Sequence, residues 1–183
     1  MALFVVPANA QAAEWHIQDN ATGGDCSLIG TWDTQTKTCT LSQNLSQGII
    51  MEGVNIILDG NGRTITGNNT GNGVYLNGNT GITIKNLNVQ NFLNGILLSE
   101  AFNNTLTSNT TSNNNTGISI TDGSSNNVLT GNTASNNSDS GIFLYSSINN
   151  ALTGNTANSN HIGIYLYSSA TNYNTLTDNT AEE

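Results

Sequence analysis

Four aromatic side chains in the last third of the chain are the side chains best spaced to contact a ligand. Phe143 and Tyr145 are two residues apart, as are Tyr165 and Tyr167, and the second pair follows the first after 22 residues. Alternate residues of an extended strand point to the same face, so each pair faces one way. Exposed aromatic groups of this kind bind sugar rings or a partner protein, although they also stabilise sheets as cross-strand ladders. We predict a contact surface at these four residues, with the ladder as the alternative.

Side chains for acid–base or metal chemistry are scattered through the chain. Asp59 lies in the run Asp59-Gly60-Asn61-Gly62, close to Arg63, and is a candidate calcium ligand or catalytic acid. That run is first of all a tight-turn pattern. His161 is a candidate general base, but the sequence shows no recognisable nucleophile–base pair. Glycoside hydrolysis needs two carboxyl groups within about 5–10 Å, and the sequence pairs none. We therefore predict no catalytic residue, no metal site and no cofactor.

The only two cysteines are Cys26 and Cys39. Between them, residues 30–38 have the pattern of a hairpin. In a secreted protein such a pair forms a disulfide, worth about 3 kcal/mol of stability. We predict the bond Cys26–Cys39.

These side chains belong to a repeat. The pattern Gly-(Ile/Val)-x-(Leu/Ile) begins at five glycines separated by 22, 22, 24 and 22 residues: Gly73, Gly95, Gly117, Gly141 and Gly163. A second apolar column runs through Ile84, Leu106, Leu129, Leu152 and Leu176. A fixed period of this length indicates a solenoid, in which each coil buries its apolar side against its neighbours.

The residue types favour strands over helices. The repeats consist of Asn, Thr, Ser and Gly with a few β-branched or leucyl positions, which suit strands and turns. Ile118 and Ile120 point one way while Ser119 and Thr121 point the other. We predict an all-β fold, a parallel β-helix of about six coils of 22–24 residues. Its core is formed by two columns: Val74, Ile96, Ile118, Ile142, Ile164; and Leu76, Leu98, Ile120, Leu144, Leu166.

Regularly spaced asparagines are expected at the corners of the coils. One column is Asn104, Asn127, Asn150 and Asn174, and a second is Asn109, Asn132, Asn155 and Asn179. Asparagine tolerates left-handed backbone and can form amide ladders along a stack. Threonine columns also occur, but their Thr-x-x-Thr spacing fits the flat Thr-x-Thr ranks of ice-binding β-helices poorly.

The segment Leu58–Ile65, followed by repeats such as Asn127–Thr133, resembles the right-handed β-helix repeats of the pectin-lyase-like superfamily. Within it, the chain is most similar to carbohydrate-binding-and-sugar-hydrolase repeats, including a periplasmic family linked to nitrous oxide reductase maturation and copper. The resemblance covers about residues 49–180. It implies a right-handed β-helix, but such repeats occur in lyases, hydrolases, surface proteins and scaffolds.

The copper association is not carried over to this chain. Its histidines are His16 and His161, its methionines are Met1 and Met51, and no His/Cys/Met cluster has ligand spacing.

The net charge of the chain limits the kinds of molecule that it can bind. The net charge is −9, with Lys37, Arg63 and Lys85 as the only basic residues. Nucleic acids require Lys and Arg to neutralise phosphates, so they are excluded. The same acidity disfavours an anionic membrane surface and a polyanionic substrate such as pectate.

Composition divides the chain into three segments. Residues 1–13 contain a short apolar stretch, Ala2–Val6, followed by Ala-x-Ala at residues 8–10 and 10–12. This pattern is typical of the end of a secretory signal peptide, with a capping strand as the alternative. Residues 14–48 are predicted to cap the first coil, and residues 49–183 to form the coils. The sequence stops halfway through a repeat, which indicates either a fragment or an edge covered by a partner. No segment is apolar enough to span a membrane.

These observations predict a secreted, non-catalytic β-helix scaffold or cell-surface module, with the periplasm as an alternative location, that contacts polysaccharide through the aromatic face. One rival function is self-assembly into an extracellular filament or surface layer through coil ends or the aromatic face. The other is a fragment of a polysaccharide lyase or hydrolase.

Overall fold

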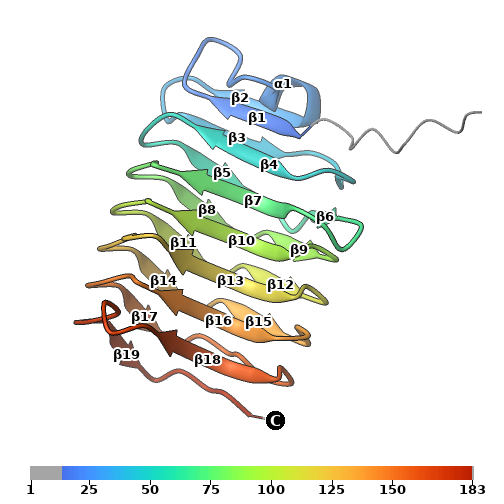
Figure 1. Ribbon diagram of the computed structural model, residues 1–183. Coiled ribbons are helices and arrows are strands. Elements are labelled where there is room, and N and C mark those ends of the chain that lie inside the picture. Colours follow the sequence, from blue (N-terminus) through green and yellow to red (C-terminus); the bar gives the residue numbers. More distant parts are fainter. Residues whose placement is uncertain (1–13, 183) are drawn as a thin grey trace, which may run out of the picture.

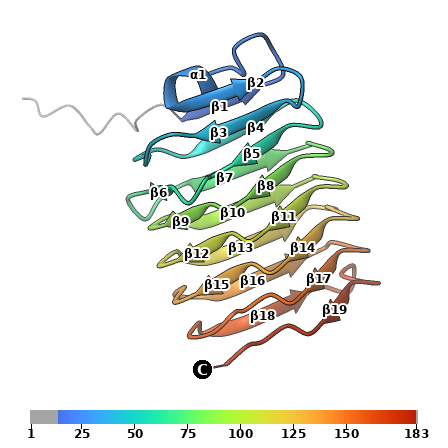
Figure 2. The same ribbon diagram turned by 180° about the vertical axis from the view of Figure 1, so that it is seen from behind.

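The chain forms the predicted right-handed parallel β-helix, with coils stacked along one axis (Figure 1). The structure is a computed structural model and describes residues 14–182. The predicted signal-peptide remnant, residues 1–13, lies outside the described residues. Seen from behind, the coils follow one another in sequence order (Figure 2). No helix within the described residues is long and apolar enough to cross a membrane.

Three sheets run along the axis, and each coil contributes one strand to a sheet, apart from one hairpin at the N-terminal end. The first is seven-stranded and entirely parallel, with the order β1 (Trp15–Gln18), β4 (Ile49–Glu52), β7 (Asn72–Asn77), β10 (Asn94–Ser99), β13 (Thr116–Thr121), β16 (Ser140–Tyr145), β18 (Ile162–Tyr167).

The second sheet is eight-stranded. Its order is β19 (Thr175–Thr177), β17 (Ala151–Thr153), β14 (Val128–Thr130), β11 (Thr105–Thr107), β8 (Thr83–Lys85), β5 (Ile57–Asp59), β3 (Thr38–Leu41), β2 (Gly30–Asp33). The third sheet is four-stranded, with the order β15 (Thr133–Ser135), β12 (Thr110–Ser112), β9 (Asn88–Gln90), β6 (Thr64–Thr66). Among all these pairs only β2 and β3 are antiparallel.

The predicted core columns are confirmed. Ile118 pairs with Ile96 on one side and with Ile142 on the other, and Ile142 pairs with Ile164. The side chains of Ile96, Ile118 and Ile142 are fully buried. Leu166 and Leu176, predicted as core residues, are 40% and 44% exposed because β18 and β19 are edge strands of their sheets.

Buried asparagines connect the coils at their corners, as predicted. The Oδ1 of Asn127 accepts both the main-chain N–H and the side-chain Nδ2 of Asn104, at 2.9 and 3.0 Å. The same contact recurs along both predicted columns and along a third column that the sequence did not single out: Asn114, Asn137 and Asn160.

The left-handed backbone lies one residue earlier than expected. Asn103, Asn126 and Asn149 have φ of 56–58°, whereas the ladder asparagines that follow them do not have positive φ. The exposed residue of each doublet therefore makes the turn, and the buried residue makes the ladder.

The N-terminal segment carries the predicted disulfide. Cys26 and Cys39 are bonded, with their Cα atoms 5.8 Å apart, and both are fully buried. The predicted hairpin is formed by β2 and β3, in which Trp32 pairs with Cys39. A single-turn helix that was not predicted, α1 (Cys26–Ile29), precedes the hairpin at this end of the molecule (Figure 1).

Candidate functional site

The four predicted aromatic residues form one cluster on the seven-stranded sheet, which we call the aromatic strip. Phe143 pairs with Tyr165 and Tyr145 with Tyr167 across the neighbouring strands β16 and β18. The ring centroids are 5.5 and 5.7 Å apart between the strands, and 6.3 and 5.6 Å apart along them. The interplanar angles of 18–41° describe stacked and tilted pairs.

Strand alternation turns the strip toward solvent. Ile142 and Leu144 are buried on the inner side of β16, so the intervening Phe143 points outward. Tyr145 is 38% exposed and Tyr167 is 53% exposed, whereas Phe143 and Tyr165 are half-buried. The strip thus combines a packed apolar centre with more open tyrosine side chains.

Toward the N-terminus the outer face of this sheet changes character. In the column of Phe143, the preceding strands carry Ser119, Leu97 and Tyr75. In the neighbouring column, β13 and β10 end in Thr121 and Ser99. The strip is therefore bordered by small polar residues on this side.

A polar cluster that sequence reasoning missed lies on the outer side of β1 and β4, at the other end of the same sheet. The Nδ1 of His16 lies 2.7 Å from Glu52 Oε1, and Gln18 Nε2 donates to Glu52 Oε2. The hydrogen bond from Gln18, followed by the bond and charge of His16, lowers the pKa of Glu52. The signal available in the sequence was alternation: His16 and Gln18 flank the buried Ile17.

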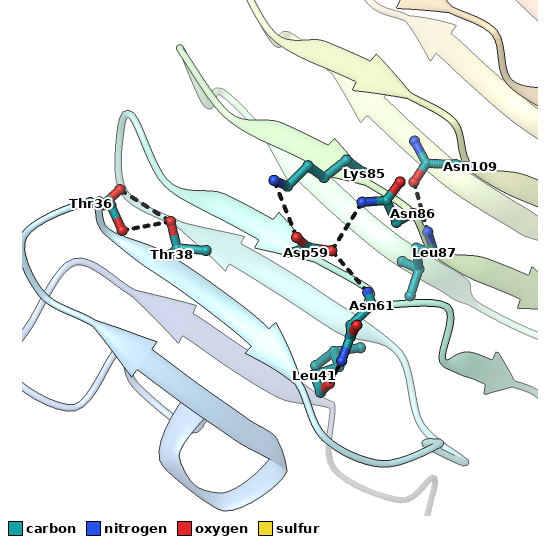
Figure 3. A network of polar contacts seen from close by, with 9 residues as sticks. All are labelled: Thr36, Thr38, Leu41, Asp59, Asn61, Lys85, Asn86, Leu87 and Asn109. Atoms are coloured by element: carbon teal, nitrogen blue, oxygen red, sulfur yellow. Dashed lines mark hydrogen bonds and ion pairs between the residues drawn. The ribbon is translucent and has the colours of Figure 1, made fainter.

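Asp59 pairs with Lys85, whereas Arg63 is the basic residue nearest to it in the sequence. Its carboxylate lies 3.1 Å from Lys85 Nζ and accepts hydrogen bonds from the main-chain N–H of Asn61 and from Asn86 Nδ2, at 2.9 and 3.2 Å (Figure 3). Burial alone would raise the pKa of Asp59, but these hydrogen bonds and Lys85 outweigh it and lower the pKa. Both carboxylate oxygens of Asp59 thus hold the turn after β5 against β8. A general acid needs a raised pKa, so the lowered pKa of Asp59 does not suit that role.

Two further acidic residues, which the sequence did not pair, lie on adjacent coils. Glu100 and Asp122 directly follow the paired residues Ser99 and Thr121, so they occupy equivalent corners of adjacent coils. Asp122 accepts hydrogen bonds from both of those hydroxyls at 2.8 Å. His161 is exposed, and the hydrogen bonds of the described residues include none from its side chain.

Metal-binding capacity is poor in the described part of the chain. Residues 14–182 contain no group of three or more His, Cys, Asp or Glu side chains that could hold a metal ion. Met51 is buried in the core, and both cysteines are consumed by the disulfide.

Comparison with known proteins gives one matching family model and several solved structures with a similar fold. The family model described as "Periplasmic copper-binding protein (NosD)" matches residues 33–183. A crystal structure of a double mutant of the periplasmic alginate epimerase AlgG superposes with a TM-score of 0.68 at 24% identity, covering 79% of this chain and 34% of the epimerase. This chain thus spans about a third of the length of that enzyme.

Two more distant structures have TM-scores below 0.5. Pectate lyase Pel9A has a TM-score of 0.47 and 16% identity, covering 87% of this chain and 57% of the lyase. The A-module of the Azotobacter vinelandii mannuronan C-5 epimerase AlgE4 has a TM-score of 0.43 and 14% identity, covering 76% of this chain and 53% of the module. Among curated proteins, no sequence matches the chain significantly. At these identities the structural likeness is one of fold.

Proposed function

Since this chain belongs to the NosD family of periplasmic β-helix proteins, we propose that it is a non-catalytic scaffold module of the periplasm or cell surface that contacts polysaccharide through the aromatic strip. Residues 14–48 act as the cap of its first coil. The single observation that carries the proposal is the two-by-two packing of Phe143, Tyr145, Tyr165 and Tyr167 on an exposed sheet face.

The chemistry of the strip suits sugars. Its rings offer apolar surface to the C–H groups of a sugar, and its three tyrosines add hydroxyls that donate and accept hydrogen bonds. The rings occupy equivalent positions on two neighbouring coils, so two successive units of a polysaccharide can meet equivalent side chains. The acidic net charge of −9 favours a neutral polysaccharide over a polyuronate.

The copper named in the family description does not fit the described residues. Copper sites use thiolate, thioether and imidazole ligands in close groups. Here Met51 is buried, Cys26 and Cys39 are bonded, and the Nδ1 of His16 is engaged by Glu52. We therefore assign no step of the function to copper.

Replacement of the strip tests the proposal. Phe143, Tyr145, Tyr165 and Tyr167 are changed together to Ser, and retention on immobilised neutral polysaccharides is compared with the parent. The matched control changes Val54, Phe102 and Ile148 to Ser, because these exposed apolar residues belong to a different column of the stack. We expect the strip variant to lose retention and the control to keep it, with both retaining a β-rich circular dichroism spectrum.

Self-association through the strip is the second candidate, and it is favoured by the exposed apolar character of the same rings. Sedimentation velocity over a range of protein concentrations separates the two functions. Concentration-dependent dimers that disappear in the strip variant, without glycan retention by the parent, would replace the glycan proposal with an assembly surface.

A third candidate, glycoside hydrolysis, is favoured by the equivalent corner positions of Glu100 and Asp122. We expect no release of reducing sugar from polysaccharides. Activity that disappears in Glu100→Gln and Asp122→Asn would make the protein an enzyme and overturn the non-catalytic assignment.

A further inference from the structure

A groove follows the corner where the four-stranded sheet leads into the seven-stranded sheet. Its larger cavity, of about 540 Å³, is lined by Asn69, Phe92, Asn113, Asn114, Asn115, Asn136, Asn137, Ser138 and Ser159. A second cavity of about 290 Å³ lies against residues 46–48 and 66–72 and shares Phe92 with the first. We call the two cavities together the corner groove. The larger one falls within the range of about 300–1,000 Å³ that is typical of small-molecule sites.

The lining of the larger cavity is polar and uncharged. It contains amides, hydroxyls and one aromatic ring, although the chain as a whole has twelve acidic residues. The smaller cavity adds one charged residue, Glu14. Neither cavity has a cationic side chain that could neutralise a phosphate or carboxylate of a ligand, and the larger cavity has no carboxylate group that could bind a cation. The lining therefore favours an uncharged ligand rich in hydroxyls.

The amides of the groove divide into two classes. The Nδ2 of Asn114 donates to Val89 O and to Asn137 Oδ1, while its Oδ1 accepts the N–H of Phe92. The ladder amides thus form their hydrogen bonds within the fold. Asn113 and Asn136 are exposed, and the hydrogen bonds of the described residues include none from their side chains.

The uncommitted amides recur from coil to coil. Asn113 and Asn136 have φ of 57° and 59°, and Asn69 and Ser159 hold the same left-handed corner in other coils, with φ of 67° and 56°. Strand spacing sets this repeat at about 4.8 Å per coil. An amide can accept from one hydroxyl and donate to the next, so the column offers a repeated partner for vicinal hydroxyls.

Phe92 supplies an apolar floor between the cavities. In its coil, Phe92 occupies the position that the ladder residue Asn114 occupies in the next coil. The side chain of Phe92 is 5% exposed. A Cβ atom at Gly67 would lie 2.6 Å from this ring, so the glycine is needed for the ring to occupy the corner.

We propose that the corner groove is a second glycan-binding site, in which a neutral oligosaccharide lies along the helix axis with the side-chain amides of Asn113 and Asn136 bonded to its hydroxyls. The site is separate from the aromatic strip and does not require the strip to bind.

The test removes the two amides without straining the backbone. Asn113→Gly/Asn136→Gly keeps the positive φ, since glycine adopts it freely. The matched control is Asn126→Gly/Asn149→Gly: these residues are also exposed, have φ of 58° and 56°, and line neither cavity. The probes are short neutral cello-, manno- and xylo-oligosaccharides, with oligogalacturonate as the charged comparison, measured by calorimetry and by NMR of the side-chain amides.

We expect at least one neutral probe to shift the Asn113 and Asn136 amide signals, with oligogalacturonate inactive. Loss of two hydrogen-bonding amides should weaken its affinity about tenfold or more, against less than twofold in the control. If the glycine variant fails to fold, Asn113→Asp/Asn136→Asp keeps the side-chain shape and should weaken binding as well.

The proposal is overturned if no neutral probe shifts these signals at millimolar concentration, if oligogalacturonate binds as well as the neutral probes, or if the groove variant and the control bind equally. The quadruple strip variant distinguishes the two sites. Groove shifts that persist in it support a separate site, whereas shifts that vanish with the strip overturn the corner groove and leave the strip as the glycan surface.

Discussion

The Oδ1 atom of Asn132 accepts two hydrogen bonds from Asn109, one from its main-chain N–H and one from its side-chain Nδ2, both at 3.0 Å. Asn132 in turn donates its own Nδ2 to the main-chain oxygen of Leu106 at 2.9 Å. One buried amide thus satisfies three polar groups of the preceding coil. This contact explains how so polar a sequence supports a regular stack, because each coil closes the hydrogen bonds of the one before it.

Asn132→Ala should therefore destabilise the protein strongly. It removes three buried hydrogen bonds, two donated by Asn109 and one accepted by the carbonyl of Leu106, at about 1 kcal/mol for each bond. We expect a loss of about 3 kcal/mol in the free energy of unfolding, measured by urea denaturation. Asn115→Ala, at an exposed asparagine, is the control and should change stability by less than about 0.5 kcal/mol. Equal effects of the two substitutions would contradict the ladder's role.

The sequence predicted the stack because its signal is repetition. The columns of Ile96, Ile118 and Ile142 could be aligned by period alone, and the register agrees. The third ladder was not singled out, because Asn114 stands within a run of three asparagines, Asn113–Asn115, and only the backbone decides which of them turns inward. The partner of Asp59 was missed for a related reason: Arg63 is nearer in sequence, but parallel pairing of β5 with β8 aligns Asp59 with Lys85.

Ile142→Asp should destabilise the stack more than any surface change. Ile142 is fully buried between Ile118 and Ile164, and an aspartate there would be an unpaired charge in a narrow core. We expect a loss above about 4 kcal/mol, or failure to fold, as judged by thermal denaturation. Tyr145→Asp, on the outward side of the same strand, should fold and lose far less. A stable Ile142→Asp protein would mean that the column is not the core.

Thr111→Val should stabilise the protein. Thr111 lies at the inward centre of β12 and is fully buried, and its hydroxyl has no hydrogen-bond partner among the described residues. Valine has nearly the same shape without the hydroxyl, so the variant should gain about 1 kcal/mol in urea denaturation. Thr110→Val, at a half-buried neighbouring position, should change little. A loss of stability in Thr111→Val would show that its hydroxyl is hydrogen-bonded in solution.

Asp59 should make a pH-dependent contribution to stability. Its pKa in the folded protein is lowered from the ordinary value of 3.8 by its hydrogen bonds and by Lys85. The stabilisation is therefore fully present above pH of about 4 and is lost as the pH falls through the lowered pKa. We expect Asp59→Asn to cost about 1 kcal/mol at pH 7 and progressively less below pH 4, as measured by urea denaturation at each pH. A cost that does not change with pH would contradict the ionised pair.

The candidate sites were predictable to different degrees. The strip follows from alternation within one strand and a 22-residue shift, both of which are local properties of the sequence. The corner groove does not, because the lining of its larger cavity alone comes from five coils and depends on which amide of each doublet stays free. The doublets Asn113–Asn114 and Asn136–Asn137 are visible in the sequence, but equal doublets at Asn126–Asn127 and Asn149–Asn150 line neither cavity, so a doublet alone does not indicate the groove.

The described residues of this chain do not supply the ligands for the copper that the family description names. Copper(I) favours thiolate and thioether ligands and copper(II) favours imidazole, in groups that close around the ion. Within residues 14–182, His16 and His161 lie in β1 and just before β18, at opposite ends of the seven-stranded sheet, and Met51 is buried. We expect the oxidised protein to form no stoichiometric complex with either copper ion when a colorimetric chelator competes at micromolar concentration. His16→Ala/His161→Ala should behave like the parent in this titration. A one-to-one complex that resists the chelator and is lost in the double variant would mean that the histidines recruit ligands that the described fold keeps apart.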